Sequence, residues 1–154
     1  SNIHSLNCTG LRFFTVYGPY GRPDMALFKF TKAIIEKTSI NLFNKGEHYR
    51  DFTYVTDIAD GIINLIKKPS KEKIPFNIFN IGNNKPKSLR TYLRIIEDYL
   101  NDKAKINLKP LQQGDVLKTH ANIKKISSWS NYNPKINIEK GIKNFINWYK
   151  GFYR

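Results

Sequence analysis

The sequence predicts an α/β fold. A run of β-type residues at 11–16 ends at a turn rich in glycine and proline, and Asp24 then opens an amphipathic helical segment. This order places a ligand loop at the carboxyl end of a strand, as in α/β sheets. Strand-like and helix-like segments also alternate along the rest of the chain. Because no repeat or low-complexity linker interrupts the 154 residues, they are predicted to form one structural unit, 1–154.

The first half of the chain contains three predicted strands and two predicted helices. Asp24 is the predicted N-cap of the first helix, and Thr56 or Asp57 that of the second, because short polar side chains favour this position. The expected elements are strand 9–16 (buried), helix 24–37, strand 40–43, a glycine turn at 44–47, strand 50–55 and helix 56–67. In the second helix the residues expected to face inward are Ile58, Ile62, Leu65 and Ile66.

The second half continues the alternation of helices and strands. Ser88 and Asn122 are predicted caps, and Pro134 breaks the chain. The expected elements are loop 69–75, strand 76–81, helix 88–100, strand 106–108, loop 110–115, a short helix from 122 and helix 138–149. An apolar stripe on the last helix indicates core packing and comprises Ile142, Phe145, Ile146 and Tyr149.

The net charge of +14 first suggests a polyanionic partner, either nucleic acid or an acidic membrane. The positive residues are mostly lysines spread along the chain together with many Ile and Asn, whereas a nucleic-acid binder more often clusters its cations. We therefore expect no nucleic-acid partner. No apolar run is long enough for a membrane span and residues 1–7 do not resemble a signal peptide, so we expect a cytoplasmic protein.

Cysteine and histidine offer little catalytic chemistry. Cys8 is the only cysteine, which excludes a disulfide framework, fits a reducing compartment and is expected to be a small buried residue. His4, His48 and His120 lack the spacing of metal ligands, so we expect no metal site. We interpret the three histidines as surface residues or as residues that support a site without touching its ligand.

Three loops carry polar residues that look functional. The first contains Thr15 and Arg22, and its glycines and prolines make it rigid. The second contains Arg50, one of few arginines in a lysine-rich chain; it is suited either to a phosphate or carboxylate, or to a pair with Asp51 or Asp57. The third, at 111–116, contains Asp115, which could accept hydrogen bonds from ribose hydroxyls or belong to an ordinary turn.

These segments together resemble the C-terminal part of the extended short-chain dehydrogenase/reductase family. They are most similar to its nucleotide-sugar epimerases, in particular the UDP-glucuronate 4-epimerases. The matching stretches are 11–31, 50–57, 79–82, 113–116 and 118–121. The resemblance implies the last strand of an NAD(P)-binding Rossmann-like fold plus a small α/β substrate-binding domain. It divides the unit into residues 1–24, the tail of the Rossmann half with the sugar loop, and residues 25–154.

Full-length members of the family epimerise a UDP-sugar through a 4-keto intermediate with bound NAD. They use a Tyr-x-x-x-Lys pair and a Gly-rich loop, and this chain has neither at the matching place. The resemblance therefore implies no catalytic residue in this chain, NAD held mainly by an N-terminal half, and inactivity of the chain alone. It also implies a UDP-sugar ligand, with UDP-glucuronate as the expected substrate, and a full-length homodimer.

The resemblance assigns roles by position. Thr15 and Arg22 match sugar-binding residues, with Arg22 suited to a uronic-acid carboxylate, and Arg50 matches the residue that grips the diphosphate. Gln112 stands where epimerases of uncharged sugars have arginine, although glucuronate-type members also tend to have glutamine. The remaining assignments are Phe13 and Tyr17 beside the nicotinamide, Ala26 and Leu27 along the nucleotide, Leu42, Phe43 and Asn44 at uracil, and Asp115 at the ribose.

The sequence leaves open the role of Lys29 and the choice among several functions of this fold. Lys29 could add a third cation for the ligand or lie on a solvated helix face. The same fold also serves sugar dehydratases and 4-epimerases of N-acetylated sugars, while a basic nucleic-acid module is the non-catalytic alternative. A contact between Arg22 and a carboxylate of the ligand would distinguish a UDP-glucuronate 4-epimerase from these alternatives. Binding that depends strongly on salt would identify the nucleic-acid module.

Overall fold

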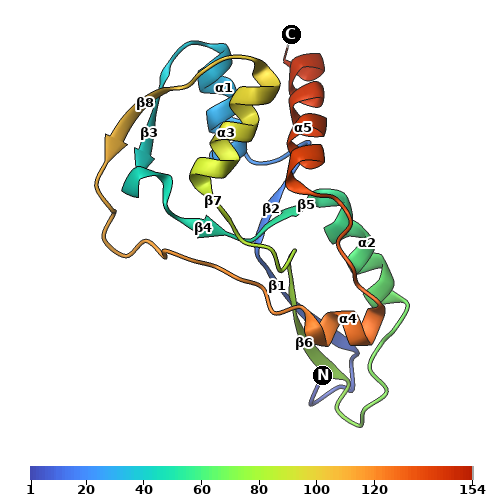
Figure 1. Cartoon of the computed structure of the whole chain (residues 1–154). Helices are drawn as coiled ribbons and strands as arrows, with labels where there is room; N and C mark the ends of the chain where they lie inside the picture. Colours follow the sequence, from blue (N-terminus) through green and yellow to red (C-terminus); the bar gives the residue numbers. More distant parts are fainter. Residues whose placement is uncertain (154) are drawn as a thin grey trace.

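The computed structural model describes residues 1–153, and within them strands and helices alternate as the sequence predicts (Figure 1). The strands are β1 (Cys8–Phe13), β2 (Thr15–Tyr17), β3 (Ser39–Phe43), β4 (Tyr49–Arg50), β5 (Phe52–Tyr54), β6 (Phe76–Ile81), β7 (Lys87–Ser88) and β8 (Lys105–Lys109). The helices are α1 (Ala26–Ile35), α2 (Val55–Ile66), α3 (Leu89–Leu100), α4 (Lys124–Ser130) and α5 (Ile138–Phe152), with a 3-10 turn, η1 (Asn44–Gly46). The α/β class is therefore confirmed.

The strands form short pairs rather than one broad sheet. Pairs β1·β6, β2·β5 and β3·β8 are parallel, and β4·β7 is antiparallel. Parallel pairing requires long crossovers, and the helices and loops between the paired strands supply them. The elements that the site uses, β2, β4 and β5, meet near the middle of the molecule (Figure 1).

Two strands that the sequence predicts as continuous are each divided. The predicted strand 9–16 breaks at Phe14, where the chain leaves β6 and joins β5. The predicted strand 50–55 breaks at Asp51, between β4 and β5. The apolar run continues across Phe14, and Asp51 stands within an alternating run, so neither pattern reveals that the chain changes its pairing partner.

The expected burial of the first strand is also wrong. Phe13 is 52% exposed, and Cys8 at the start of β1 is only partly buried. Within residues 1–153, β1 pairs with β6 alone, which leaves its other edge uncovered.

The predicted caps of the first two helices are wrong: Asp24 does not cap α1, and neither Thr56 nor Asp57 caps α2. Helix α1 begins after Met25, and Asp24 binds Arg22 instead of capping. Helix α2 begins after Tyr54, and Asp57 lies buried in its first turn, where it accepts hydrogen bonds from the N–H groups of Lys135 and Ile136, both at 3.0 Å. A neighbouring guanidinium thus competes for Asp24, and N–H groups of a distant segment compete for Asp57, so residue type alone overestimates capping.

Other local predictions are confirmed. The Ser88 side chain accepts the N–H of Thr91 and caps α3. Asn122 accepts the N–H of Lys124 at the start of α4, although Ile123 is the boundary residue. Gly46 in the 44–47 turn has a positive φ of 78°. In α2, however, Ile66 is 74% exposed rather than inward-facing.

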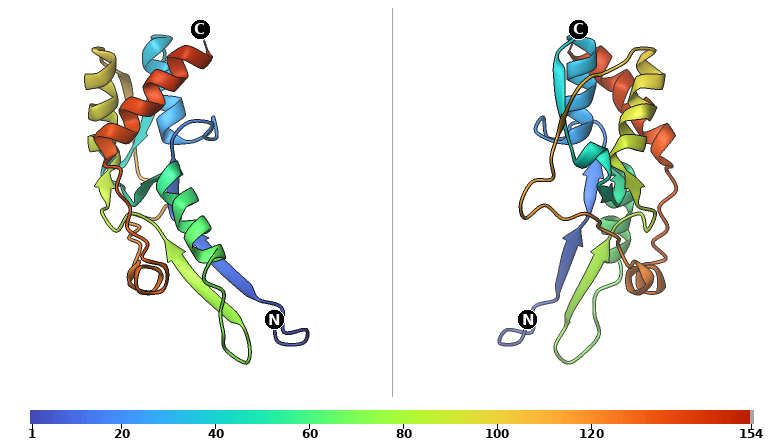
Figure 2. Two further views of the ribbon diagram at one scale, coloured as in Figure 1. Left: turned by 90° about the vertical axis from the view of Figure 1, so that its right-hand side faces the viewer. Right: turned by 60° about the vertical axis from the view of Figure 1, so that its left-hand side comes forward.

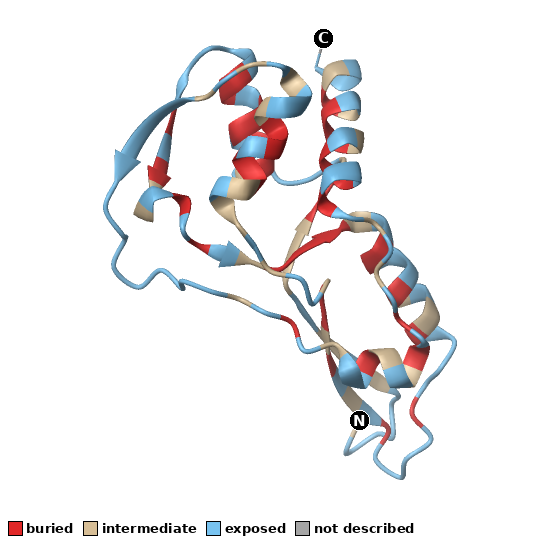
Figure 3. Ribbon diagram, in the orientation of Figure 1, coloured by how far each residue is buried: buried red, intermediate tan, exposed pale blue. Residues whose placement is uncertain are grey.

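The buried residues form two groups (Figure 3). The larger lies among α1, α3 and α5 and includes the complete stripe predicted on α5. The smaller lies among α2, α4 and β6. Figure 2 shows the three-helix end and, away from it, the long β1·β6 pair that leads to the N-terminus. Within residues 1–153, the structure contains no helix with the length and apolarity that crossing a membrane requires.

Candidate functional site

A cavity of about 230 Å³ opens where β2, the 18–25 loop, α1 and β4 meet. A second hollow of about 650 Å³ adjoins it and shares Thr15, Arg22 and Arg50 in its wall. The carboxyl end of β2 therefore does carry a hollow, as the strand–loop–helix order predicts. The predicted site residues that line the first cavity are Thr15, Tyr17, Arg22, Ala26, Leu27, Phe43, Arg50 and Asp115.

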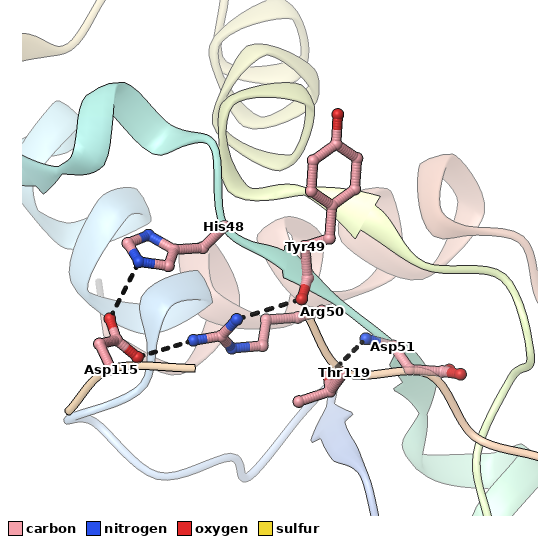
Figure 4. A network of polar contacts seen from close by, with 6 residues as sticks. All are labelled: His48, Tyr49, Arg50, Asp51, Asp115 and Thr119. Atoms are coloured by element: carbon pink, nitrogen blue, oxygen red, sulfur yellow. Dashed lines mark hydrogen bonds and ion pairs between the residues drawn. The ribbon is translucent and has the colours of Figure 1, made fainter. Parts of the chain in front are cut away.

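Asp115, the residue assigned to the ribose, holds Arg50 in the cavity. Arg50 Nη2 donates to Asp115 Oδ1 at 2.9 Å, and Arg50 Nη1 donates to the backbone oxygen of Tyr49 at 3.1 Å (Figure 4). The alternative pair with Asp51 or Asp57 is excluded, because both of those carboxylates accept backbone N–H groups elsewhere. Within residues 1–153 Arg50 forms an ion pair with Asp115 alone, so two of the predicted ligand residues form one unit.

Asp51 lies on the opposite side of the strand from Arg50 (Figure 4). It is completely buried and accepts the N–H groups of Asn83, Asn84 and Ala121 at 2.8, 3.0 and 2.8 Å. Successive side chains of an extended chain point to opposite faces, so a buried Asp51 directs Arg50 toward the cavity. Asp51 thereby ties the end of β6 and the 119–121 segment to the base of the site.

His48 is a site residue whose position the sequence did not predict. It is 3% exposed, lines the first cavity, and its Nε2 lies 3.2 Å from Asp115 Oδ2. Of the two interpretations of His48, the surface position is excluded, whereas a residue that supports the site agrees with its place beside Asp115. A signal was present, since residues two apart in extended backbone share a face, which places His48 beside Arg50.

Arg22 lies at the mouth of both hollows on the exposed loop. Its Nε and Nη2 donate to the two oxygens of Asp24 at 3.0 and 2.5 Å, so Asp24 occupies the guanidinium fork. The hydrogen bond from Arg22 lowers the pKa of the Asp24 carboxyl below its usual range. Because the pair is exposed, an incoming anion can displace it at little cost.

Tyr17 lines both hollows, but its ring packs into the core. It makes edge contacts with Phe52, Tyr54 and Tyr92, and its hydroxyl lies 3.5 Å from the backbone oxygen of Asn137. Burial raises the pKa of Tyr17 far above its usual range, so the hydroxyl is uncharged. Phe13, the other residue assigned to the nicotinamide, lines the second hollow only.

Four assigned residues lie outside both hollows. Lys29 is exposed and lines a separate depression with Phe43. Leu42 is completely buried, Asn44 begins η1, and Gln112 is exposed and accepts the N–H of Asp115 through its backbone oxygen. The structure thus brings together the residues assigned to sugar, diphosphate and ribose, and leaves Lys29 apart. Residues 1–153 contain no cluster of three or more potential metal ligands.

The family model described as "NAD dependent epimerase/dehydratase family" matches residues 2–82, which cover β1 to β6 and the Arg22 and Arg50 segments. The chain therefore belongs to the NAD dependent epimerase/dehydratase family.

Similar sequences include UDP-glucuronate 4-epimerase 5 of Arabidopsis thaliana, which is 43% identical over 99% of this chain and 38% of its own length. Protein CapI of Staphylococcus aureus is 42% identical over 100% of this chain and 50% of its own length. A crystal structure of UDP-glucuronic acid 4-epimerase from Bacillus cereus, in complex with UDP-glucuronic acid and NAD, matches with a TM-score of 0.90. That match is 29% identical and covers 99% of this chain and 48% of that one.

The chain spans about half the length of the curated relatives it matches, or less. The part it does span is consistent with a C-terminal fragment of such an enzyme. The predicted relationship to the nucleotide-sugar epimerases is confirmed.

Proposed function

We propose that this chain is the substrate-binding part of a UDP-sugar 4-epimerase whose substrate is UDP-glucuronate. The observation that carries the proposal is that Arg22 and Arg50 line one cavity from two different elements, with Asp115 beside Arg50. The names of the Arabidopsis and Bacillus proteins support the same substrate.

The charges of the cavity match those of the proposed substrate. A UDP-uronate carries about three negative charges, two on the diphosphate and one on the carboxylate, and arginine binds both groups through paired hydrogen bonds. In the proposed complex Arg50 binds the diphosphate, Asp115 accepts a ribose hydroxyl and Thr15 contacts the sugar. Arg22 exchanges Asp24 for the carboxylate of the uronate.

The second hollow suits the flat ring of a nicotinamide. Phe13, Phe14, Pro19 and Tyr20 line it, and Phe13 is half exposed there. NAD, when bound, would take a hydride from the sugar and return it. The residues of this chain contribute an apolar wall that excludes water and holds the sugar against that ring.

We assign the remaining functions to the rest of the full-length enzyme. Residues 1–24 would complete its NAD-binding half, and residues 25–154 would form its substrate-binding domain. The proton-transfer residues, most NAD contacts and the dimer contacts would lie outside this chain. We further propose a cytoplasmic enzyme that supplies a uronic acid for polysaccharide synthesis.

Calorimetric titration of the chain with UDP-glucuronate and UDP-glucose tests this function. We expect Arg22→Ala to weaken UDP-glucuronate binding by about tenfold, which corresponds to about 1.4 kcal/mol of binding free energy. The reason is that, of the two ligands, only UDP-glucuronate has the carboxylate. Binding of UDP-glucose should change little. Equal losses for both ligands would contradict the assignment of UDP-glucuronate, and epimerase turnover by the chain alone would contradict its role as a binding part.

A further inference from the structure

His48 and Arg50 both approach the same carboxylate. Arg50 Nη2 holds Asp115 Oδ1 at 2.9 Å, and His48 Nε2 lies 3.2 Å from Asp115 Oδ2 (Figure 4). Although that oxygen is close, the His48 N–H is not aligned with it, so Nε2 is buried without a hydrogen bond in residues 1–153. The Nε2 atom of His48 is therefore a buried polar atom beside Asp115 that is free to form a hydrogen bond.

The charges around His48 come from the elements that surround it. Within the cavity they belong to Arg22, Arg50 and Asp115. On the adjoining backbone, Glu47 precedes His48, Arg90 follows Leu89, whose N–H donates to the His48 backbone oxygen, and Lys118 pairs with Tyr49. Two tyrosines, Tyr17 and Tyr92, also line the cavity, and burial raises the pKa of both, so they stay neutral. Asp115 is the carboxylate among the cavity residues, and it is the group that His48 approaches.

Ligand binding at this site would remove the charge partner of Asp115. In the proposed complex Arg50 turns from Asp115 to the diphosphate. The Asp115 side chain is 33% exposed, and once a ligand covers it, a carboxylate without its cation is destabilised unless another donor replaces Arg50. His48 is already within 3.2 Å and can supply that donor, with a positive charge when its imidazole is protonated.

We propose that His48 becomes the charge partner of Asp115 when Arg50 binds the diphosphate of a nucleotide sugar, so that binding takes up a proton at His48. His48 is thus a positioning residue, which holds Asp115 toward the ribose without touching the ligand. The inference rests on the proposed function of Arg50. Because the complex favours the protonated imidazole, affinity for the ligand must rise as the pH falls, and the charge of the diphosphate acts in the same direction.

Calorimetric titration of the chain with UDP-glucose tests the proposal at about pH 6 and about pH 8, where imidazole charge changes. Each titration is made in two buffers with different heats of ionisation, which gives the number of protons taken up. UDP-glucose is chosen because its diphosphate keeps its charge over this range. We expect proton uptake, and an affinity that is about three- to tenfold higher at the lower pH.

Two variants locate the proton. His48→Gln keeps a donor beside Asp115 without the charge, so proton uptake and the pH dependence should disappear. His120→Gln is the matched control, because His120 is exposed and contacts Asn84 outside both hollows. It should behave as the wild type.

The outcomes separate this inference from the proposed function. Binding without proton uptake, or uptake that persists in His48→Gln, overturns the inference and leaves the function intact. Absence of UDP-glucose binding at both pH values contradicts the function itself. If His48→Gln does not fold, NMR of the imidazole in the wild type decides, since added UDP-glucose must shift His48 toward its protonated form.

Discussion

At the scale of single residues, Gly141 allows α5 to pack against Tyr17, a residue of the cavity wall, because it has no side chain. It lies in the first turns of α5, opposite the buried ring of Tyr17. A Cβ at residue 141 would overlap the Tyr17 hydroxyl and lie 2.7 Å from its Cζ. Tyr17 contacts Phe52 and Tyr92, which also line the cavity, so Gly141 determines how closely α5 approaches the ligand site.

We therefore predict that Gly141→Ala destabilises the fold, although alanine is the better helix former. The overlap should lower the free energy of unfolding by about 1–3 kcal/mol in urea denaturation. Gly151→Ala is the control in the same helix, because nothing lies within 4 Å of its Cβ position. It should be neutral or slightly stabilising, and equal destabilisation by both changes would refute the steric explanation.

A second residue-scale prediction concerns the Arg22–Asp24 pair. Since the hydrogen bond from Arg22 lowers the pKa of Asp24, Arg22→Ala should raise it toward the usual aspartate value. The pair stabilises the loop above the pKa of an unpaired aspartate, and this contribution is lost as the pH falls through the lowered pKa. NMR titration of the Asp24 carboxyl carbon measures the change. An identical midpoint in wild type and Arg22→Ala would show that the pair does not form in solution.

At the scale of elements, Asp51 connects segments that are distant in sequence. It lies between β4 and β5, and its carboxylate accepts N–H groups from the turn after β6 and from Ala121. The Asn83 side chain also donates to the backbone oxygen of Phe52 in β5. The Asp51 carboxylate therefore helps to hold the 112–121 segment, which carries Asp115, against Arg50, together with the backbone hydrogen bonds of Tyr49 to Leu117 and Thr119.

We predict that Asp51→Asn destabilises the chain by about 1–3 kcal/mol, because an amide has one acceptor oxygen and its NH₂ would face a donor N–H. Asp60→Asn is the control, since Asp60 is exposed on α2. Its effect should remain within about 0.5 kcal/mol. Thermal and urea unfolding measure both variants, and similar effects of the two substitutions would exclude the structural role of Asp51.

At the scale of the whole molecule, sequence predicts those features that depend on local pattern. The alternation of elements, the Ser88 cap and the apolar stripe of α5 follow from spacing and side-chain type. The divisions at Phe14 and Asp51 could not be predicted, because they depend on which distant strand pairs with each half. The Asp24 cap failed for a local reason, since the guanidinium of Arg22, two residues away, competes for that carboxylate.

The candidate site shows the same limit. Arg22, Arg50 and Asp115 were recognisable from motifs, but the contact between Arg50 and Asp115 joins residues 65 positions apart. The spacing of His48 from Arg50 indicates a shared face, but its contact with Asp115 depends on the same distant segment. Lys29 illustrates the opposite case, because a favourable charge in sequence lies on the exposed side of α1, away from both hollows.

The central claim is that one site of this strongly basic chain, and not its general charge, binds a UDP-sugar. Titration of the wild type, Arg50→Ala and Arg94→Ala with UDP-glucuronate tests it, because Arg94 is an exposed arginine of α3 outside both hollows. We predict that Arg50→Ala weakens binding by about tenfold or more, while Arg94→Ala changes it by less than about twofold. Equal weakening by the two substitutions, or no binding by the wild type, would contradict the claim.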